Sequence, residues 1–501
     1  MHLLLHFYRK NFITNGLCCV LFLIASTHQI EIPLTLSSIS NYANYIRYSG
    51  MLNSVDYKLL TGEFYIGTPK QSLNLLLDTT SSVSWIPKSN LNNYFMHTFD
   101  PSRSKTFFNF GTSKEAPYED LIQKGELSAD VIDFTTQKRN KQLAPNFHFI
   151  LVDSEEEPNS KVTGFDGTMS LLRHDHIKNI ERKSLTYNTD ELTGYSLPEY
   201  LAQEHVINRN KFAIEYLPNN HSTLYIDEEE LLNEIISNKN NTSGKCSFNK
   251  DFNPNWHCLI KSINIKNTSK QIKQIDLLSN EYAILDSSQP YIIAPRRSGL
   301  SILEYYRSLY KGCSMYSKYD TYTFLVCKGS YFNVTNVPKL CITLGNKEIC
   351  LENEDLFYNG CDEISQNSLY VFKLIVFEFD NDEWKLGLPV FYKRMVMFDN
   401  DLNQITFVEV NEYSDIAHDY NKRKVLLKKE EKIVYMKRIY VYFIILIIAM
   451  ICFMLRVNLI YKELSRRIVN KKKHFLCNKV ANLISNKTNA VELKEIVNFD
   501  Y

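Results

Sequence analysis

The sequence predicts a mainly β protein with one membrane-spanning helix near its C-terminus. Between about residues 57 and 410, short apolar or alternating runs are separated by polar loops, a pattern typical of many short strands. The chain is rich in Tyr and Phe (32 and 29) and poor in Gly and Pro (16 and 14), which favours aromatic-rich β structure. An uncharged apolar stretch near the C-terminus predicts the helix. The clearest strand candidates are Phe64–Ile66, Leu73–Leu77, Ala129–Phe134, Phe147–Val152, Trp256–Ile265 and Tyr282–Leu285.

The overall composition is that of a folded protein without a dominant charge. A length of 501 residues leaves room for two or three domains. Hydrophobic residues (44%) and charged residues (23%) are at ordinary levels. Lys and Arg (57) nearly balance Asp and Glu (56), so no global positive field points to nucleic acid as a partner.

The first 27 residues have the order of a secretory signal peptide. Arg9 and Lys10 are basic, Leu17–Ile24 is apolar, and Ala25–Thr27 are small. An uncleaved anchor is the alternative. We therefore expect residues 1–27 to direct the chain into the secretory pathway.

A second apolar segment predicts a transmembrane helix. Ile439–Leu455 contains no charged residue over its 17 positions, and the apolar stretch resumes after Arg456. At about 1.5 Å per residue, residues 439–461 are long enough to cross the hydrocarbon core of a bilayer.

The charges around this segment predict its orientation. Arg456–Tyr501 contains ten Lys/Arg and four Asp/Glu, so the positive-inside rule places it in the cytosol. Residues 411–438 are then a charged luminal stalk and residues 462–501 a basic cytosolic tail. The sequence predicts a single-pass type I membrane protein whose lipid partner is the bilayer around the helix, with an organelle that stays open.

Seven of the eleven cysteines lie in the second half of the predicted luminal region. An oxidising lumen would pair most of them, and one must stay unpaired. Cys341–Cys350 reads as a hairpin that turns at Gly345 and Asn346, which would place its two cysteines opposite each other. The seven are Cys246, Cys258, Cys313, Cys327, Cys341, Cys350 and Cys361.

One local pattern occurs at two distant positions. An apolar strand ends on Asp78, followed by Thr79–Ser81, and another ends on Asp286, followed by Ser287–Ser288. Together with the segments below, this pair resembles the two active-site loops of the pepsin family of aspartic proteases, including the plasmepsins of apicomplexan parasites. The resemblance covers nearly all of Leu60–Val410. The other matching segments, in family order, are Gly62–Gln71, Trp85–Pro87, Phe99–Ser102, Phe165–Gly167, Trp256, Ile292–Pro295, Leu386–Phe391 and Val396–Asp399.

The resemblance implies a bilobal pepsin-like aspartic protease fold with one catalytic Asp in each lobe. On this basis residues 57–225 form the N-terminal lobe and residues 226–410 the C-terminal lobe. Residues 28–56 are a short region that resembles the family's inhibitory prosegment. A single Arg47 among them gives weak support for a zymogen, because such a segment blocks the acidic cleft with cations.

The resemblance also implies roles for the residues of the two loops. Asp78 and Asp286 would activate water, since two close carboxyl groups cannot both ionise and so share a proton. The hydroxyls of Thr79 and Ser287 would tie the loops together. The Ser81 hydroxyl would contact the first carboxylate.

Several positions depart from the family pattern. The family has Gly where this chain has Thr80 and Ser288, so a side chain must fit beside closely packed backbone. The flap hairpin of the family aligns with Leu121–Ala129, which includes Gly125. The flap Tyr would fall at Ile122, and Tyr118 could replace it only in a shifted register.

The resemblance implies part of the disulfide pattern. Cys327 and Cys361 match the large disulfide of the family's second lobe, beside the Cys341–Cys350 hairpin pair. Cys246–Cys258 is the third expected pair, which leaves Cys313 free. The alternative, in which Cys313 is paired and one of Cys246 and Cys258 is free, also stays open.

The sequence therefore predicts a membrane-anchored aspartic endopeptidase that acts on proteins or peptides and needs no metal or organic cofactor. The rival interpretation is a catalytically impaired member of the family whose cleft binds a peptide or protein partner without cutting it. A receptor or adhesin that uses the fold as a scaffold is a third interpretation.

Overall fold

The computed structural model of the chain divides into two compact units, Met1–Asn411 and Glu412–Tyr501. The structure describes residues 30–39, 57–91, 95–118, 121–134, 144–155, 164–173, 196–217, 222–227, 235, 242–248, 255–267, 272–277, 281–318, 322–361, 368–377, 383–409 and 454–481. The signal-peptide segment, the stalk and most of the predicted transmembrane helix lie outside these residues.

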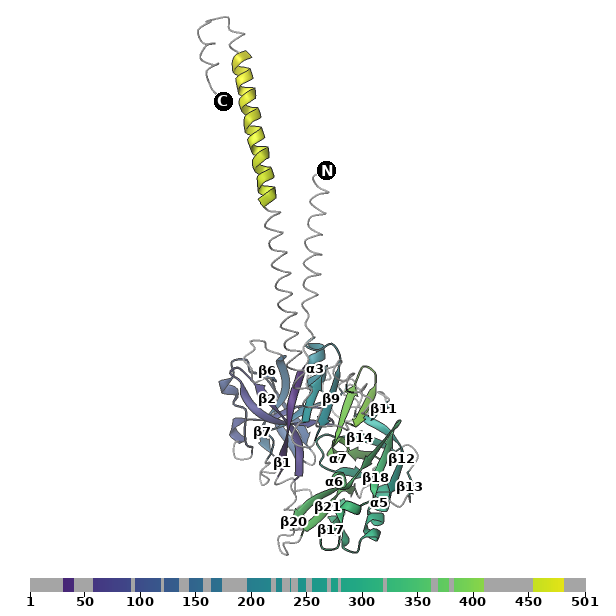
Figure 1. Cartoon of the computed structure of the whole chain (residues 1–501). Coiled ribbons are helices and arrows are strands. Elements are labelled where there is room, and N and C mark those ends of the chain that lie inside the picture. Colours follow the sequence, from purple (N-terminus) through teal and green to yellow (C-terminus); the bar gives the residue numbers. More distant parts are fainter. Residues whose placement is uncertain are drawn as a thin grey trace. The chain divides into compact units, whose positions relative to one another are not determined.

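Within the described residues, the first sheet has thirteen strands in the order β11-β24-β23-β9-β10-β1-β2-β3-β8-β4-β7-β6-β5 (Figure 1). Its early strands are β1 (Ile30–Ile39), β2 (Tyr57–Ile66), β3 (Gln71–Asp78), β4 (Trp85–Pro87), β5 (Phe108–Tyr118), β6 (Leu121–Asp133), β7 (Ala144–Glu155) and β8 (Thr168–Ser170). Its later strands are β9 (Lys211–Tyr216), β10 (Ser222–Ile226), β11 (Thr242–Ser247), β23 (Arg394–Asp399) and β24 (Gln404–Glu409).

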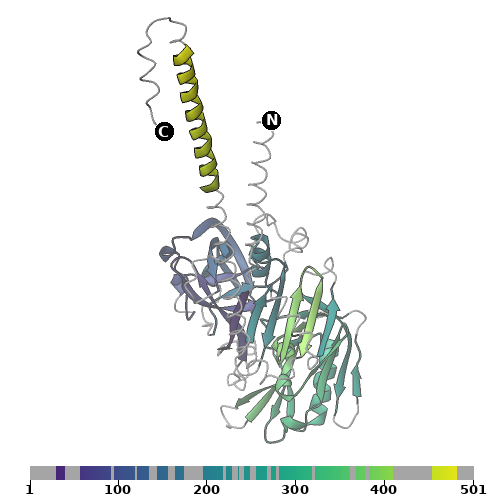
Figure 2. The same cartoon turned by 45° about the horizontal axis from the view of Figure 1, so that its top comes forward.

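The second sheet has eleven strands and follows the order β16-β17-β21-β15-β22-β14-β12-β18-β19, with β13 beside β12 and β20 beside β21. Figures 1 and 2 show these teal and green strands grouped apart from the purple and blue strands of the first sheet. The strands are β12 (His257–Lys266), β13 (Ile272–Ile275), β14 (Tyr282–Leu285), β15 (Ile292–Ala294), β16 (Cys313–Lys318), β17 (Tyr322–Lys328), β18 (Lys339–Leu344), β19 (Lys347–Leu351), β20 (Phe357–Cys361), β21 (Ser368–Phe377) and β22 (Glu383–Leu386).

The described helices of the first unit are few and short, as a mainly β chain predicts. The longest, α5 (Arg296–Leu309), packs against β21 and buries Ile302, Leu303 and Tyr306. The Tyr306 hydroxyl donates to the carbonyl of Pro338, 2.8 Å away. The others are α3 (Leu197–Gln203), α6 (Asn353–Leu356) and α7 (Leu388–Phe391).

The strand predictions are confirmed in place, although β2, β6 and β7 extend well beyond the predicted segments. The six predicted segments lie in β2, β3, β6, β7, β12 and β14, and Tyr282–Leu285 is the whole of β14. The Cys341–Cys350 hairpin is also confirmed. It turns at Gly345, whose φ of +58° is one that a residue without a Cβ adopts freely.

Strands from distant parts of the sequence are neighbours in the first sheet. Strand β23, near the end of the first unit, pairs antiparallel with β9 along its length, and Val396 lies opposite Ile214. Strand β1 lies between β2 and β10, with Leu34 paired to Gly62 and to Ser222. The segment that resembles a prosegment thus contributes ten residues to this sheet.

Three buried Trp side chains anchor the core of the lobes. Trp85, Trp256 and Trp384 are each at most 1% exposed. The indole of Trp256 donates to the carbonyl of Leu171, and that of Trp384 donates to the buried carboxylate of Glu281. Because these two N–H groups are satisfied, the rings of Trp256 and Trp384 fill the interior without leaving a buried donor unpaired.

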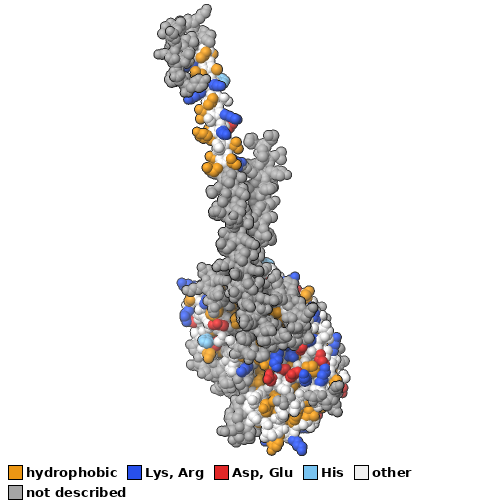
Figure 3. All heavy atoms as spheres, in the orientation of Figure 1, with side chains coloured by type: hydrophobic (Ala, Val, Ile, Leu, Met, Phe, Trp, Pro, Cys, Tyr) orange, Lys and Arg blue, Asp and Glu red, His pale blue; other side chains and the backbone are white. Residues whose placement is uncertain are grey.

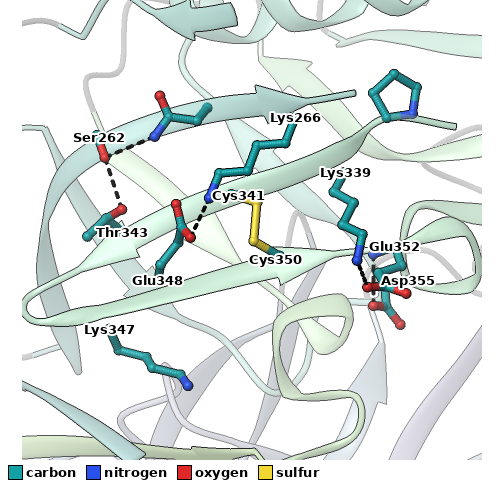
Figure 4. The surroundings of a disulfide bond; sticks show 12 residues. Ser262, Lys266, Lys339, Cys341, Thr343, Lys347, Glu348, Cys350, Glu352 and Asp355 are labelled. Atoms are coloured by element: carbon teal, nitrogen blue, oxygen red, sulfur yellow. Dashed lines mark hydrogen bonds and ion pairs between the residues drawn. A yellow bond between two sulfur atoms is a disulfide. The ribbon is translucent and has the colours of Figure 1, made fainter. Parts of the chain in front are cut away.

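Two of the expected disulfides are present. Cys246 pairs with Cys258, with Cα atoms 5.9 Å apart, and Cys341 pairs with Cys350, with Cα atoms 4.0 Å apart. Figure 4 shows the second bond across the β18–β19 hairpin, beside an ion pair between Lys266 and Glu348.

The predicted Cys327–Cys361 pair is wrong, because Cys327 is bonded to Cys313. These two residues lie directly opposite each other on β16 and β17, with Cα atoms 4.0 Å apart. Cys361 ends β20, and β21 lies between β20 and β17. Two strand spacings amount to about 9.6 Å, beyond the roughly 7 Å limit for a disulfide.

In the second unit the described residues form one helix, 454–481, with all of its side chains exposed. No helix among the described residues is long and apolar enough to cross a membrane, and most of residues 439–461 are not among them.

On the face of the first unit in Figure 3, basic and acidic side chains are intermingled, in keeping with a net charge of +1.

Candidate active site

The first loop of the site follows strand β3, which ends at Asp78. Strand β3 runs parallel to β8, and Asp78 lies opposite Ser170 at the ends of both strands. The sequence before Asp78 is apolar because Leu75–Leu77 are fully buried. The Asp78 side chain is 4% exposed, so this carboxyl group is almost removed from water.

The second loop follows β14 in the second sheet. Strand β14 runs parallel to β22, and the amide of Asp286 donates to the carbonyl of Leu386. Asp286 is 1% exposed. Gly387 lies beside this loop, where a Cβ would collide with the carbonyls of Gln289 and Tyr291. That close approach explains the glycine in the predicted Leu386–Phe391 match.

Four hydrogen bonds join the two loops, as the sequence predicts for Thr79 and Ser287. The Thr79 hydroxyl donates to the carbonyl of Leu285, and the Ser287 hydroxyl donates to the carbonyl of Leu77, each at 2.7 Å. In return, the amide of Ser287 donates to the Thr79 oxygen at 3.0 Å, and the amide of Thr79 donates to the Ser287 oxygen at 3.2 Å. This reciprocal network is buried and holds together residues 208 positions apart in the sequence.

Each carboxyl group is held by the residues that follow it. Oδ1 of Asp78 accepts hydrogen bonds from the amides of Thr80 and Ser81 and from the Thr80 hydroxyl, at 2.8–2.9 Å. Oδ1 of Asp286 accepts hydrogen bonds from the Ser288 amide at 3.1 Å and from the Ser288 hydroxyl at 2.6 Å. In both loops the residue two positions after the Asp donates through its amide and its hydroxyl, and Asp78 has the Ser81 amide as an additional donor.

The role predicted for the Ser81 hydroxyl is wrong. That hydroxyl donates to the carbonyl of Val83, and Ser81 contacts Asp78 through its backbone amide. The hydroxyls that reach the carboxylates come from Thr80 and Ser288, which the sequence analysis treated as obstacles. The only available signal was that both residues follow their Asp at the same distance and carry a hydroxyl group.

The electrostatics of the second loop couple it to the first. Burial and then the charge of Asp78 raise the pKa of Asp286 to about 6. The charge of Lys385 and the two Ser288 donors act in the opposite direction. A carboxyl group in this condition is protonated in mild acid, where an ordinary Asp is ionised.

Lys385 is a residue of the site that sequence reasoning missed. It lies on β22 between the fully buried Trp384 and Leu386, so its half-buried side chain points to the other face of the sheet. On that face it is paired with Ile284, two residues before Asp286. Lys385 makes no ion pair with any described residue, which leaves its charge to act on the dyad.

The hairpin of β5 and β6 corresponds to the predicted flap. Tyr118 is the last residue of β5 and is opposite Leu121, while Ile122 is opposite Pro117. The backbone therefore brings Tyr118 and Ile122 to the same tip. Gly125 is further from the tip, where a Cβ would collide with the Leu151 carbonyl on β7.

The described residues contain one cluster with the spacing of a metal site, formed by Cys341, Glu348 and Cys350. The two sulfur atoms are bonded to each other in a disulfide (Figure 4), so they are not available as thiolate ligands.

Two β lobes that meet through paired Asp-Thr and Asp-Ser loops are the hallmark of two-domain peptidases that use two aspartates. The family model of eukaryotic aspartyl proteases matches residues 60–410, the greater part of the chain. The chain belongs to this family.

Curated relatives match over shorter stretches. The chain is 32% identical to chymosin of Callithrix jacchus over 115 residues, which are 22% of this chain and 28% of chymosin. It is 34% identical to gastricsin of Oryctolagus cuniculus over 113 residues, 22% of this chain and 28% of gastricsin. It is 32% identical to plasmepsin IV of Plasmodium falciparum over 125 residues, 24% of this chain and 26% of that protein. Each alignment spans little more than a quarter of the relative.

Proposed function

We propose that this protein is an active aspartic endopeptidase that hydrolyses peptide bonds in proteins, with Asp78 and Asp286 as its catalytic residues. The observation that carries the proposal is the reciprocal hydrogen-bond network of Thr79 and Ser287. It holds two buried carboxyl groups from different sheets at one junction, which is what catalysis by a shared proton needs.

The environments of the two carboxyl groups suggest which is the base and which is the acid. Asp78 accepts three hydrogen bonds from the residues that follow it. Asp286 accepts two, is more completely buried and has a pKa raised to about 6, mainly by that burial. In mild acid Asp286 is then the carboxylic acid, and we assign the role of general base to Asp78.

The reaction follows from this assignment. Asp78 takes a proton from a water molecule as the water oxygen attacks the peptide carbonyl carbon, and Asp286 gives its proton to the carbonyl oxygen. The tetrahedral intermediate then collapses: the C–N bond breaks as Asp78 gives its proton to the leaving nitrogen, and a hydroxyl of the intermediate returns its proton to Asp286. No covalent enzyme intermediate forms, and the dyad ends with one proton, as it began.

We base the proposed flap on the pairing of β5 with β6. Tyr118, the last residue of β5, is the aromatic residue that we assign to the flap, and it lies opposite Leu121, next to Ile122 on β6. A hairpin tip of this kind excludes water from the reacting groups when it closes.

We also propose that residues 1–27 are a signal peptide and residues 439–461 a transmembrane helix. The active-site region would then be luminal or extracellular, and the basic tail would be cytosolic. The observations behind this are the charge order of the two apolar segments and the three disulfides of the first unit, which an oxidising compartment maintains.

The test of the enzyme proposal is a peptide-cleavage assay of the full-length protein in detergent, across acidic to neutral pH. The matched control is the Asp78→Asn/Asp286→Asn double variant, which keeps the shape of both side chains. We expect cleavage by the wild type with a bell-shaped pH profile and loss of at least about 1,000-fold in the control. A silent wild type that still binds peptides would favour the non-catalytic interpretation.

A further inference from the structure

The residue two positions after each Asp carries a hydroxyl group in this chain. In both loops that hydroxyl and the amide of the same residue donate to one oxygen, Oδ1 of the preceding carboxyl group. The same arrangement occurs in both loops: Thr80 donates to Asp78, and Ser288 donates to Asp286.

The side chains of Thr80 and Ser288 do not force the backbone into a strained conformation. Thr80 and Ser288 are absent from the described residues with positive φ, so neither occupies the left-handed region that favours glycine. Ser288 is 3% exposed, and its hydroxyl is 2.6 Å from its acceptor. The loops therefore accommodate the extra atoms through a new hydrogen bond in each.

The other hydroxyls of the loops are engaged elsewhere. Those of Thr79 and Ser287 donate to backbone carbonyls of the opposite loop, and that of Ser81 donates to Val83. Among the described residues, only the Thr80 and Ser288 hydroxyls donate to the two carboxyl groups. All of these donors lie on Oδ1, so the residues that the structure describes leave Oδ2 of each Asp free for water or substrate.

We infer that Thr80 and Ser288 are positioning residues, whose hydroxyls fix Oδ1 of each aspartate as the structural oxygen and direct Oδ2 toward the reacting water. This inference rests on the proposed endopeptidase function. It replaces the expectation that these two side chains impair the dyad. In this chain the hydroxyl groups of Thr80 and Ser288 contribute to the alignment at positions where the family has glycine.

The hydroxyls of Thr80 and Ser288 should affect the pH dependence of catalysis. A hydrogen bond to an ionised carboxylate stabilises the charged form, so removing a hydroxyl should make the pair hold its protons at higher pH. The charged groups that face Asp286 are Asp78 and Lys385. Both remain when Thr80 or Ser288 is changed, so a change in titration is attributable to the lost hydroxyl.

The test compares Thr80→Val and Ser288→Ala, which remove the hydroxyls with little change of shape, with Thr80→Ser and Ser288→Thr, which keep them. We expect the first two to shift the limbs of the kcat/KM profile upward by about half to one pH unit and to lower kcat about tenfold, with KM nearly unchanged. The hydroxyl-keeping variants should restore the wild-type profile. Equal profiles for Thr80→Val, Ser288→Ala and wild type would overturn the inference.

Thr168→Val is the matched control for the substitution itself. Thr168 is buried on β8, next to Leu76, and its hydroxyl has no hydrogen-bond partner among the described residues. Its loss should leave the pH profile in place. If this variant moves the profile as far as Thr80→Val does, the effect belongs to packing and the inference fails.

A second readout separates this inference from the proposed function. An epoxide reagent is opened by ionised carboxylates, so the pH at which half of Asp78 and Asp286 are labelled, measured by peptide mass spectrometry, reports their ionisation without any cleavage. We expect this pH to rise in Thr80→Val and in Ser288→Ala. A rise in a protein that never cleaves would refute the enzyme proposal and keep the hydroxyl role. An unchanged labelling pH in an active enzyme would refute the hydroxyl role alone.

Discussion

At the scale of single residues, Lys385 contributes a positive charge to the surroundings of Asp286. A lysine on the strand beside Asp286 favours the ionised form of that carboxyl group and so opposes the effect of burial. The pKa of about 6 at Asp286 is the balance of these influences, with burial the largest.

Replacing Lys385 by Met removes this charge while keeping the length of the side chain. The pKa of Asp286 should then rise above its present value of about 6, and Asp286 should remain a proton donor to higher pH. The basic limb of the kcat/KM profile should therefore move upward by about half a unit or more. Lys385→Arg, which keeps the charge, is the control. A basic limb that stays in place or moves to lower pH would show that Lys385 does not act on the dyad.

The two aspartates of the loops could be predicted from the sequence, but the hydrogen bonds of the neighbouring hydroxyl groups could not. Asp78 and Asp286 could be found because an apolar strand must precede each buried acid. The direction of a hydroxyl depends on side-chain rotation and on which backbone groups are already paired, and neither is written in the local pattern. That is why the predicted Ser81 contact was wrong and why Thr80 and Ser288 were taken for obstacles.

At the scale of elements, strand register decides the disulfides. The Cys341–Cys350 pair could be predicted because both cysteines lie on one hairpin with a two-residue turn. Cys313 and Cys327 lie on β16 and β17, which are joined by a longer connection, so their register is not visible in the sequence. A likeness to the family then suggested Cys361, which β21 separates from Cys327.

The Cys313–Cys327 bond should stabilise the end of the second sheet. In a chain-entropy account, a bond that closes a loop of about 15 residues contributes about 3 kcal/mol. Cys313→Ser with Cys327→Ser should therefore lower the thermal midpoint of the lobe by several degrees. Cys361→Ser is the control, and it should have little effect. Non-reducing peptide mapping should recover a Cys313–Cys327 peptide, and recovery of Cys327 with Cys361 would contradict the register.

The flap hairpin offers a second prediction at this scale. Because β5 ends at Tyr118, at the tip of the proposed flap, Tyr118→Ala should lower kcat/KM by about tenfold or more. Tyr118→Phe should retain much of the ring's effect if packing dominates. Ile122→Ala is the matched change on the facing strand and should cost less. A larger loss at Ile122 than at Tyr118 would favour the register that the sequence first suggested.

At the scale of the whole molecule, the first sheet depends on contacts between distant parts of the chain. β23 and β24 close against β9 and β11, and β1 lies between β2 and β10. Local periodicity predicts that these strands exist, but not their order, because pairing between segments far apart in the chain depends on the complete fold. The division into two lobes came from family likeness, and this interlaced sheet could not be predicted from the individual segments.

The same sheet contains a buried acid that should make the fold more stable in acid than at neutral pH. Glu215, on β9, is 9% exposed and accepts a hydrogen bond from Tyr225 on β10. Burial raises its pKa from 4.5 to about 7, the Tyr225 hydrogen bond lowers it and the nearby charge of Glu31 raises it. Between pH 4.5 and 7 the folded state therefore holds a proton that the unfolded state has lost, so stability falls as pH rises.

Glu215→Gln should remove this dependence, because an amide keeps an oxygen to accept from Tyr225 and cannot ionise. A shift of this size corresponds to about 3 kcal/mol of unfolding free energy that the wild type loses between about pH 4.5 and about pH 7.5. Unfolding midpoints of wild type and Glu215→Gln should be similar at the acidic end of this range and differ at the neutral end, where the variant is more stable.

The exposed Glu204→Gln is the control and should follow the wild type. Asp286, with its pKa raised to about 6 chiefly by burial, contributes in the same direction and remains in both variants, so part of the acid preference should persist. If Glu215→Gln loses stability equally at both pH values, Glu215 acts through packing alone. Stability that falls toward acid in the wild type would contradict the role argued here for the buried Glu215.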